Sequence, residues 1–533
     1  MKKILYPLLI LLLAGLTDAC SPRQKELIIV STNDLHARFF DSAYVNDAVN
    51  PGSLSKVHAY VTSLRETYGK KQVLLLDVGD VLQGDNAAYY YNYKDTSGGQ
   101  HLMSLIFNYM DYDAAIVGNH DIETGHPVYD RLRDELDCPY LAANAIDSAG
   151  NPWFDEYALI HKGGLRIAIL GMTNPNIPQW LNPELWSGLT FRPIEEQLQQ
   201  RIDRLRAQEQ PDLLILAIHA GIGKETLSLE NPALYLAHHL QGIDAIFAAH
   251  DHRLFCEKAG PDSTWVLEGG SRAEYVTQLS VAYTRQGGQN TITRKTAELI
   301  PLKEHPSSKK YNQTFADDYQ RVKAFTLRPV GSLSCEMDFA QALKGPSLYM
   351  NLIHRVQLDA TGSDLSISAP LNTQKRIPAG PLNFNDLYQI YPFENQLYQI
   401  WMTGAEIKAY LEQSYDNWIA GKGPAYNYDS VAGLIYEVDT RQPLGKRIRI
   451  KGLANQHPFD LQHRYTVAIN SYRASGAGGL FKLTGLTSSD LEKRISLRLP
   501  EIRTLVDEYV SRSGEITPES LRPENLGEWR FIF

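Results

Sequence analysis

Five short motifs rich in histidine, aspartate and asparagine carry the side chains of this chain that are best suited to bind metal ions. Carboxylate oxygens and imidazole nitrogens are ligands that zinc, manganese and iron all accept, so the mixture does not choose among these metals. Together the motifs predict a centre that holds two divalent ions. They are Asn33-Asp34-Leu35-His36, Val78-Gly79-Asp80, Gly118-Asn119-His120-Asp121, Ile218-His219-Ala220 and His250-Asp251-His252.

Each motif directly follows an apolar run that predicts a buried strand. The runs are rich in Val, Ile and Leu and do not alternate with polar residues, as expected of strands buried on both faces. In layered α/β folds the carboxyl ends of such strands converge on one crevice, so motifs far apart in the chain can meet there. We therefore predict one active-site crevice. The runs are residues 27–30, 73–76, 114–117, 213–217 and 245–248.

Spacing divides the predicted ligands between two ions. Asp34 and His36 are two residues apart, which on an extended segment places both side chains on the same side, where they can share one ion. Asp80 ends the next strand and offers a carboxylate that could bridge both ions. The remaining ligands complete the two sites: Asn119, His219 and His250 for one ion, and His252 for the other.

Two ions that share a carboxylate have a definite chemical use. They can neutralise a phosphoryl group while a hydroxide held between them attacks phosphorus in line. His120 is adjacent to a predicted ligand but is not needed as one, so it is the candidate to stabilise the transition state and to protonate the leaving alkoxide. Glu123, three residues further on, could hold His120 in the required tautomer.

Length and charge limit the class of protein. A chain of 533 residues is long enough for several domains, and two large ones are the most natural division. Lys and Arg number 52 and Asp and Glu 61, which gives a formal net charge of −9, and no basic cluster marks a nucleic-acid groove. Polymeric DNA or RNA is therefore a poor candidate ligand, whereas a small phosphate ester attracted by metal cations remains open.

The first twenty residues predict export. A basic start at Lys2 and Lys3 precedes an apolar core over residues 4–16, which is too short for a comfortable membrane span. The segment resembles a bacterial lipoprotein signal, residues 1–20, in which Cys20 would become the acylated first residue of the mature chain. We expect a protein anchored by lipid to a bacterial membrane, facing the periplasm or the cell surface. A cleaved, soluble secretory protein is the alternative.

The rest of the chain divides into two domains and a linker. Residues 24–300 alternate apolar strands with amphipathic helical stretches, which is typical of a layered α/β domain. Residues 301–344 are polar and predict a linker with a helix around 317–324, and a second domain follows over residues 345–533. Within it, Thr403-Gly404-Ala405-Glu406 fits a capping box that opens a helix through about Trp418.

The ordered motif set resembles the calcineurin-like metallophosphoesterases. With its C-terminal domain, the chain resembles the secreted 5'-nucleotidase and 2',3'-cyclic-nucleotide phosphodiesterase family over essentially the whole mature length. The resemblance implies a four-layer α/β/β/α first domain, an α/β substrate domain, the metal ligands given above and a catalytic His120. The chain departs from the family at Ala37 and Ala249, where glycine is common, and at Glu123, where many 5'-nucleotidases have Asp.

Residues 387–395 of the second domain place aromatic rings beside an amide, which suits stacking a base and hydrogen-bonding its edge. On these residues alone, a strand end packed against a core explains the segment equally well. By the resemblance, Phe393 forms one jaw of a nucleobase clamp and Asn395 lies beside it. The second jaw falls in the glycine-rich loop 470–481, where its ring is Tyr472 or Phe481.

A second departure concerns the subclass. Typical 5'-nucleotidases carry a Gly-Gly-x-Arg segment before the Phe motif, whereas this chain has a displaced Arg376 as the candidate substrate contact. The resemblance therefore favours the branch that hydrolyses 2',3'-cyclic nucleotides and nucleoside monophosphates to nucleoside and phosphate. The alternatives are a 5'-nucleotidase or UDP-sugar hydrolase and, from another class, a non-catalytic nucleotide-binding lipoprotein. The intact ligand set argues against the last.

Overall fold

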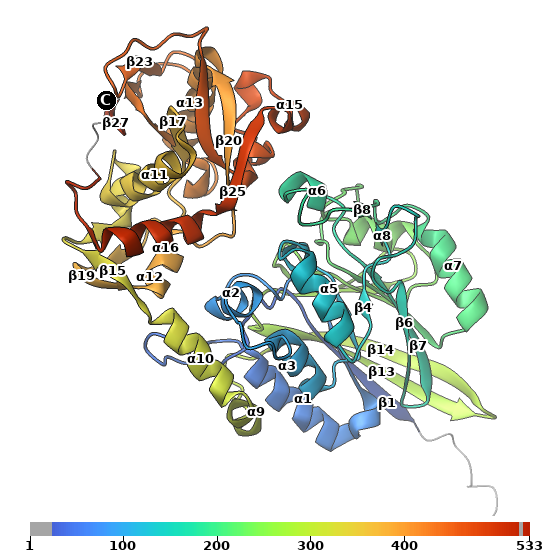
Figure 1. The fold of residues 1–533 in the computed structure, drawn as a ribbon. Helices are drawn as coiled ribbons and strands as arrows, with labels where there is room; N and C mark the ends of the chain where they lie inside the picture. The colour runs from blue at the N-terminus through green and yellow to red at the C-terminus, as the bar shows by residue number, and fades with distance from the viewer. Residues whose placement is uncertain (1–23, 522–525) are drawn as a thin grey trace, which may run out of the picture.

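A computed structural model describes residues 24–521 and 526–533, which form two domains connected by a pair of helices (Figure 1). The predicted signal segment and Cys20 lie outside these residues. Within the described part of the chain, no helix has the length and apolar character needed to cross a bilayer.

The first domain is built on two sheets of six strands each. Its central strands run parallel, as their near-continuous apolar sequences predict. The first sheet has the order β14 (Gln289–Pro301), β13 (Tyr275–Gln286), β1 (Lys25–Thr32), β2 (Val73–Asp77), β3 (Ala114–Ile116) and β4 (Tyr140–Leu141). The second has the order β11 (Leu254–Ala259), β12 (Thr264–Gly269), β10 (Ala245–Phe247), β9 (Leu213–Ile218), β7 (Leu165–Met172) and β6 (Tyr157–Lys162).

Side chains of β1 show how the layers are assembled. Leu27 and Ile29 belong to the core between the two sheets, which also contains Ile167 and Ile215 of the second sheet. Ile28 and its alternate neighbours face the opposite way, into a core shared with helices. Because both faces are covered, the strand needs apolar residues at every position. This is the burial that the apolar runs predict.

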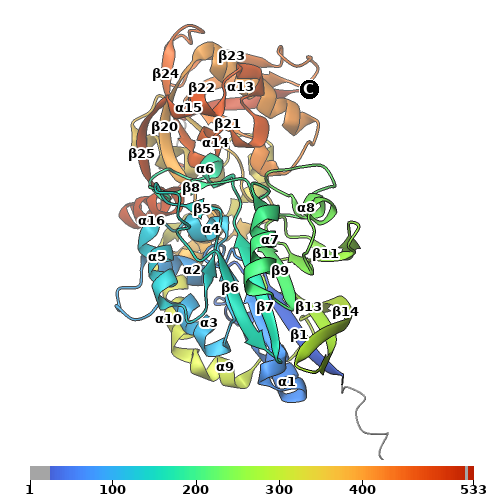
Figure 2. The same cartoon turned by 90° about the vertical axis from the view of Figure 1, so that its right-hand side faces the viewer.

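Helices cover the outer face of each sheet (Figures 1 and 2), so the domain has four layers, α/β/β/α, and the predicted fold class is confirmed. On the first sheet lie α1 (Leu54–Tyr68), α3 (Leu102–Met110) and α5 (His126–Glu135). On the second lie α7 (Leu198–Glu209) and α8 (Ala233–His239). Shorter elements at the strand ends are α2 (Asn86–Tyr93), α4 (Asn119–Ile122), α6 (Ile177–Trp180), β5 (Ala145–Ile146) and β8 (Thr190–Phe191).

The two helices between the domains are α9 (Lys309–Thr314) and α10 (Ala316–Thr326), and the helix predicted around 317–324 lies within α10. The second domain begins earlier than the predicted boundary at 345. Strand β15 (Pro329–Leu333) already pairs with β19 (Gly380–Asn383) and β26 (Glu515–Ile516). Val330 is buried in the core of the second domain, so the end of the predicted linker, although polar in composition, packs as part of that domain.

The second domain is built on a five-stranded sheet that has helices on both sides. The sheet has the order β21 (Ser430–Ala432), β17 (Leu365–Ser368), β24 (Arg464–Asn470), β20 (Gln396–Thr403) and β25 (Ile495–Glu501). One side carries α11 (Leu348–Thr361), α12 (Phe384–Ile390) and α16 (Ile502–Ser513). The other carries α13 (Gly404–Ile419) and a small sheet of β22 (Leu434–Asp439), β23 (Ile448–Leu453) and β27 (Gly527–Ile532). Other short elements are β16 (Met337–Asp338), β18 (Arg376–Ile377), α14 (Ser471–Ala474) and α15 (Ser488–Glu492).

Helix α13 opens with the predicted capping box. The Thr403 side chain accepts a hydrogen bond from the Glu406 amide, and the Glu406 carboxylate accepts one from the Thr403 amide. Two backbone donors that have no partner within the helix are thereby satisfied.

The domains meet at an aromatic contact that surrounds a buried arginine. Tyr89 of α2, in the first domain, packs in the core of the second domain. The Arg503 guanidinium lies 4.6 Å from the centroid of the Tyr89 ring and 4.4 Å from that of Tyr388. It also forms a buried ion pair with Glu394. The Tyr89 hydroxyl lies 2.7 Å from Oγ1 of Thr504, which adds a polar contact to this interface.

Candidate active site

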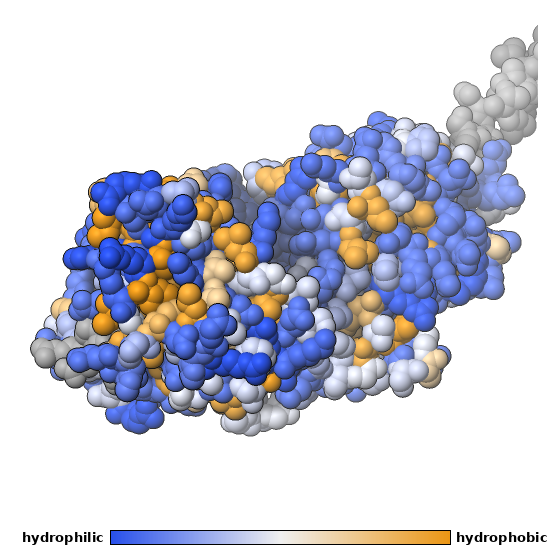
Figure 3. Space-filling view, turned by 90° about the horizontal axis from the view of Figure 1, so that it is seen from above, coloured by the Kyte–Doolittle hydropathy of each residue, from blue (hydrophilic) through white to orange (hydrophobic). Residues whose placement is uncertain are grey.

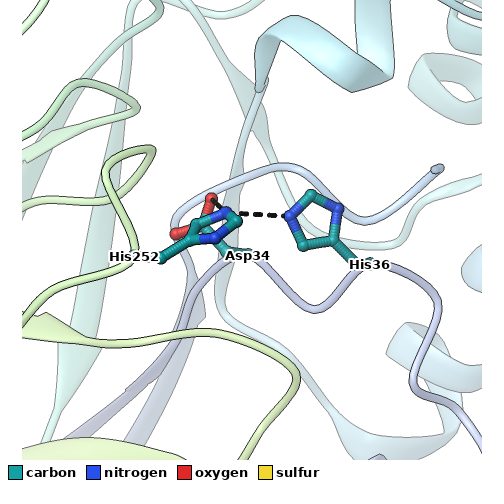
Figure 4. Close-up of side chains that lie close together, drawn as sticks. All are labelled: Asp34, His36 and His252. Carbon is teal, nitrogen blue, oxygen red and sulfur yellow. Dashed lines mark hydrogen bonds and ion pairs between the residues drawn. The ribbon is translucent and has the colours of Figure 1, made fainter. Parts of the chain in front are cut away.

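The first group of candidate metal ligands is formed by Asp34, His36 and His252 (Figure 4), whose ligand atoms all lie within 4.8 Å of one another. Nδ1 of His36 lies 3.0 Å from the Gln83 carbonyl and therefore donates, which leaves a lone pair on Nε2. That Nε2 faces Nε2 of His252 at 3.0 Å, and His252 lies 3.5 Å from Asp34. Electron-rich atoms that converge in this way fit a cation placed between them.

A second group is formed by Asp80, His219 and His250, with Asn119 beside them. Nδ1 of His219 donates to the Val78 carbonyl at 2.8 Å, so its Nε2 is directed at Asp80, 3.1 Å away, and at Oδ1 of Asn119, also 3.1 Å away. The same Asn119 oxygen lies 2.9 Å from Nδ1 of His250. The structure thus brings all four predicted ligands of this ion together.

Electrostatics support the same placement of positive charge. Burial disfavours the imidazolium form of His219, yet the neighbouring carboxylate of Asp80 outweighs it and raises the pKa of His219 to about 9. Asp80 also favours the charged form of His36 in the first group, although burial dominates there and lowers the pKa of His36 to about 4. Asp34 also favours the charged forms of His219 and His36, so the carboxylates of each group act on the histidines of the other.

The ligands sit on strained turns at the ends of the strands. Asp34, His36, Asp80, His250 and His252 all have left-handed backbones, with φ of 46°, 45°, 59°, 87° and 55° respectively. For a residue other than glycine this conformation costs about 1–2 kcal/mol. Hydrogen bonds between neighbouring turns hold it in place: the Asp34 and His36 amides donate to the carbonyls of Gly79 and Asp80, both at 2.9 Å.

Two glycines allow these turns to approach closely. A Cβ on Gly118 would lie 2.2 Å from Oδ1 of Asp80, and one on Gly79 would lie 2.8 Å from Nδ1 of His219. At Ala37, where the family commonly has glycine, the backbone still adopts φ of 54°, so the departure from the motif leaves the turn intact.

Asp121 is a functional residue to which the motif analysis gave no role. It is fully buried, and its carboxylate accepts hydrogen bonds from the amides of Gly118, Asp80, Val81 and Leu82 at 2.8–3.1 Å. These bonds fix the turn that presents Asp80 against the turn that presents Asn119. In the sequence, the only indication of this role is that Asp121 ends the Gly-Asn-His-Asp motif.

His120 stands beside the metal ligands and contacts Glu123. Nδ1 of His120 lies 2.6 Å from the Glu123 carboxylate, so it donates there and the other nitrogen is free to face the cavity. Burial disfavours the charged imidazole, but Asp80 and Glu123 outweigh it and raise the pKa of His120 to about 10. The longer side chain of Glu, where relatives often have Asp, therefore still reaches His120. A protonated His120 at this position can donate a proton to a leaving alkoxide.

A cleft of about 710 Å³ joins both domains at this centre, and Figure 3 shows the surface hollowed where they meet. Its first-domain wall includes His36, Asn119, His120, His250 and His252, and its second-domain wall includes Phe393, Asn395, Tyr426 and Tyr472.

Phe393 is exposed in this cleft, and its ring centroid lies 6.3 Å from that of Tyr426 with an interplanar angle of 79°. Asn395 and Tyr472 line the same wall. Tyr426 belongs to a short 3₁₀ turn, Ala425–Asn427, which follows the segment Gly421-Lys422-Gly423-Pro424, and the sequence analysis gave it no role. It therefore joins Tyr472 as a candidate for the second ring.

Two predicted substrate contacts are corrected. Phe481 is 3% exposed and packs edge-on against Tyr410 in the core of the second domain, so its ring does not reach the cleft. Arg376 lies on β18 outside the cleft lining, where its exposed guanidinium pairs with Asp338 at 3.3 Å. In both cases the local sequence resembled a binding segment, but packing directed the side chain elsewhere.

Arg473 lies within the glycine-rich loop and lines the cleft, and the buried carboxylate of Asp429 holds it. Its guanidinium donates to both oxygens of Asp429, at 2.9 and 3.0 Å. This two-point ion pair fixes the loop that carries Tyr472.

Comparisons with known proteins agree with this geometry. Residues 27–254 match the calcineurin-like phosphoesterase family, and residues 329–485 match the 5'-nucleotidase C-terminal domain. The chain therefore contains a calcineurin-like phosphoesterase domain followed by a 5'-nucleotidase C-terminal domain. This combination, with the ligand groups described above, makes it a phosphoric ester hydrolase that depends on divalent metal ions.

Three related proteins illustrate the extent of the similarity. The 2',3'-cyclic-nucleotide 2'-phosphodiesterase/3'-nucleotidase of Yersinia enterocolitica is 26% identical over 96% of this chain and 90% of its own length. A trifunctional nucleotide phosphoesterase of Bacillus subtilis is also 26% identical, and the match covers 93% of this chain but only 38% of that protein. A solved structure from Staphylococcus aureus, proposed to be a 5'-nucleotidase, has a TM-score of 0.79 at 22% identity and covers 95% of this chain and 100% of its own.

Proposed function

We propose that the protein hydrolyses 2',3'-cyclic nucleotides and nucleoside monophosphates to nucleoside and phosphate at a centre of two divalent ions. The observation that carries this proposal is the shared cleft, in which members of both ligand groups and the Phe393–Tyr426 pair line one cavity. One nucleotide bound in this cleft can therefore place its phosphate at the ligand groups and its base at the aromatic pair.

Each wall of the cleft has its own part in the reaction. When bound, two divalent ions neutralise the phosphoryl group and activate the attacking water. His120 donates the Nε2 proton of its imidazolium to the leaving oxygen, and Glu123 holds the ring by accepting a hydrogen bond from Nδ1. Phe393, with Tyr426 or Tyr472 as the second ring, stacks the base, and Asn395 offers an amide to its edge.

The proposed subclass is supported by the place of Arg376, the displaced counterpart of the arginine typical of 5'-nucleotidases, which pairs with Asp338 outside the cleft. The arginines that line the cleft are Arg272 and Arg473, and Arg473 is paired with Asp429. This arrangement favours the cyclic ester and 3'-nucleotide branch, to which the Yersinia relative is assigned by its name. The second candidate, a 5'-nucleotidase or UDP-sugar hydrolase, shares the same metal centre.

The proposal includes two ions, which the two ligand groups support, with zinc, manganese or iron as the candidates. It also includes a lipid anchor on Cys20 in a bacterial membrane, supported by the leader of residues 1–20. Labelling of expressing cells with a fatty-acid analogue should mark the wild-type chain and leave Cys20→Ser unmarked. An equally labelled Cys20→Ser protein contradicts the anchor.

The test of substrate class is hydrolysis of 2',3'-cyclic AMP, 3'-AMP, 5'-AMP and a nucleotide sugar by purified, metal-reconstituted protein, with the nucleotide, nucleoside and phosphate products separated by chromatography and measured side by side. Asp80→Asn, prepared identically, controls for contaminating phosphatases. We expect the cyclic ester and 3'-AMP to be the better substrates. Fast turnover of 5'-AMP with the cyclic ester untouched would favour the 5'-nucleotidase candidate. No hydrolysis of any substrate by metal-loaded protein would favour the non-catalytic nucleotide-binding protein.

A further inference from the structure

His250, which is partly exposed, differs from the buried ligand histidines His36 and His219 in what holds its second ring nitrogen. His36 and His219 each use a backbone carbonyl, from Gln83 and Val78 at 3.0 and 2.8 Å. In His250, Nδ1 faces Asn119 in the ligand group, and Nε2 lies 3.2 Å from the Glu230 carboxylate. A carboxylate can only accept a hydrogen bond at neutral pH, so Nε2 of His250 carries the proton.

The main chain of Glu230 is held in place, although half of its side chain is exposed. Its carbonyl accepts hydrogen bonds from the side chain of the buried Asn174 at 3.1 Å and from the Gly221 amide at 3.2 Å. The carboxylate is therefore presented to His250 by a loop that is tied to the end of β9. This loop carries neither an apolar periodicity nor a ligand motif.

A third side chain sets the plane of the His250 ring. Trp180 of α6 stacks on it with ring centroids 5.2 Å apart and an interplanar angle of 16°. With one face covered by Trp180 and Nε2 held by Glu230, the imidazole can present Nδ1 in a single direction, toward Asn119 in the ligand group.

We propose that Glu230 is a positioning residue for the ion held by Asp80, Asn119, His219 and His250. Its carboxylate accepts a hydrogen bond from Nε2–H of His250, which leaves the Nδ1 lone pair for the ion. Its negative charge also makes the imidazole a stronger electron-pair donor to that ion. The inference rests on the proposed metal centre but concerns one ion, and it predicts that the two sites differ in their dependence on Glu230.

The test is a titration of metal-free protein with zinc chloride in competition with a chromophoric chelator, which yields a dissociation constant for each site. Loss of a carboxylate partner of a ligand histidine typically weakens metal binding about 10–100-fold. We expect Glu230→Ala to weaken one site by that factor and to leave the other unchanged. Glu230→Gln keeps an acceptor but loses the charge, so its loss should be smaller.

Glu225→Ala is the matched control. Glu225 lies in the same loop, and its carboxylate is 3.6 Å from His238, a histidine of α8 that belongs to neither ligand group. Its removal should leave both zinc affinities at the wild-type value. As a second readout, the zinc concentration for half-maximal hydrolysis of bis-p-nitrophenyl phosphate should rise in Glu230→Ala in proportion to the weakened site.

Three results overturn the proposal. The first is an unchanged pair of affinities in Glu230→Ala, and the second is an equal weakening of both sites in Glu230→Ala and Glu230→Gln, which would indicate a general structural effect. Both leave the two-ion centre standing. The third is a wild-type protein that binds no zinc at either site, which removes the proposed metal centre together with this inference.

Discussion

Phe393→Ala is the most direct test of the division of work between the two domains. The side chain is 38% exposed and lies in the cleft. One base–aromatic stack contributes about 1–3 kcal/mol, which corresponds to a loss of about 5-fold to 150-fold in kcat/KM for 2',3'-cyclic AMP. Because the ring is not part of a core, the free energy of unfolding should change by less than about 1 kcal/mol.

The assay compares this nucleotide with bis-p-nitrophenyl phosphate, which has no nucleoside. The ions and His120 belong to the other domain, so the rate with the second substrate should hardly change. Tyr68→Ala is the matched control, because Tyr68 is similarly exposed, at 40%, but ends α1 and does not line the cleft. Equal losses on both substrates in Phe393→Ala, with Tyr68→Ala unaffected, would refute the reasoning.

Further variants test the metal centre and the domain contact. Asp80→Asn removes a carboxylate that acts on both ligand groups, so metal analysis should show fewer bound ions and the rate should fall by orders of magnitude. His120→Asn should keep its metal content and lower kcat about 10²–10⁴-fold, and a variant that loses its ions contradicts the assignment. Arg503→Met leaves the Glu394 carboxylate buried without a partner and should cost about 3–5 kcal/mol in urea unfolding. The double variant with Glu394→Gln should regain part of this loss, and an unchanged single variant would contradict the importance of the pair.

The candidate metal ligands could be predicted because their signal is local. Each follows a strand buried on both faces, and the pattern of β1, in which Leu27 and Ile28 enter different cores, is visible as an unbroken apolar run. The four-layer architecture follows from the same runs. Asp121 lay inside a predicted motif, but its four backbone contacts depend on how two turns approach each other, which spacing alone does not reveal.

The second wall of the cleft was harder to predict, because its residues meet only through tertiary packing. Tyr426 comes from a short turn that the sequence analysis did not single out. Phe481 lies in the predicted clamp segment, but its ring packs against Tyr410 in the core of the second domain. The start of the second domain was missed for a similar reason. β15 is short and contains Pro329, and only its pairing with β19 and β26 identifies it as part of a sheet.

Five candidate ligands have left-handed backbones, so the free energy of unfolding of this protein should depend on bound metal. They are Asp34, His36, Asp80, His250 and His252. Without ions, the fold bears the conformational cost of these turns and gains nothing from the ligands that they present. An ion that binds the folded chain but not the unfolded one adds about 2.7 kcal/mol when its free concentration is a hundred times the dissociation constant. When divalent metal is scarce, the protein should therefore unfold more readily as well as lose its hydrolytic activity, so that its abundance and its activity decline together.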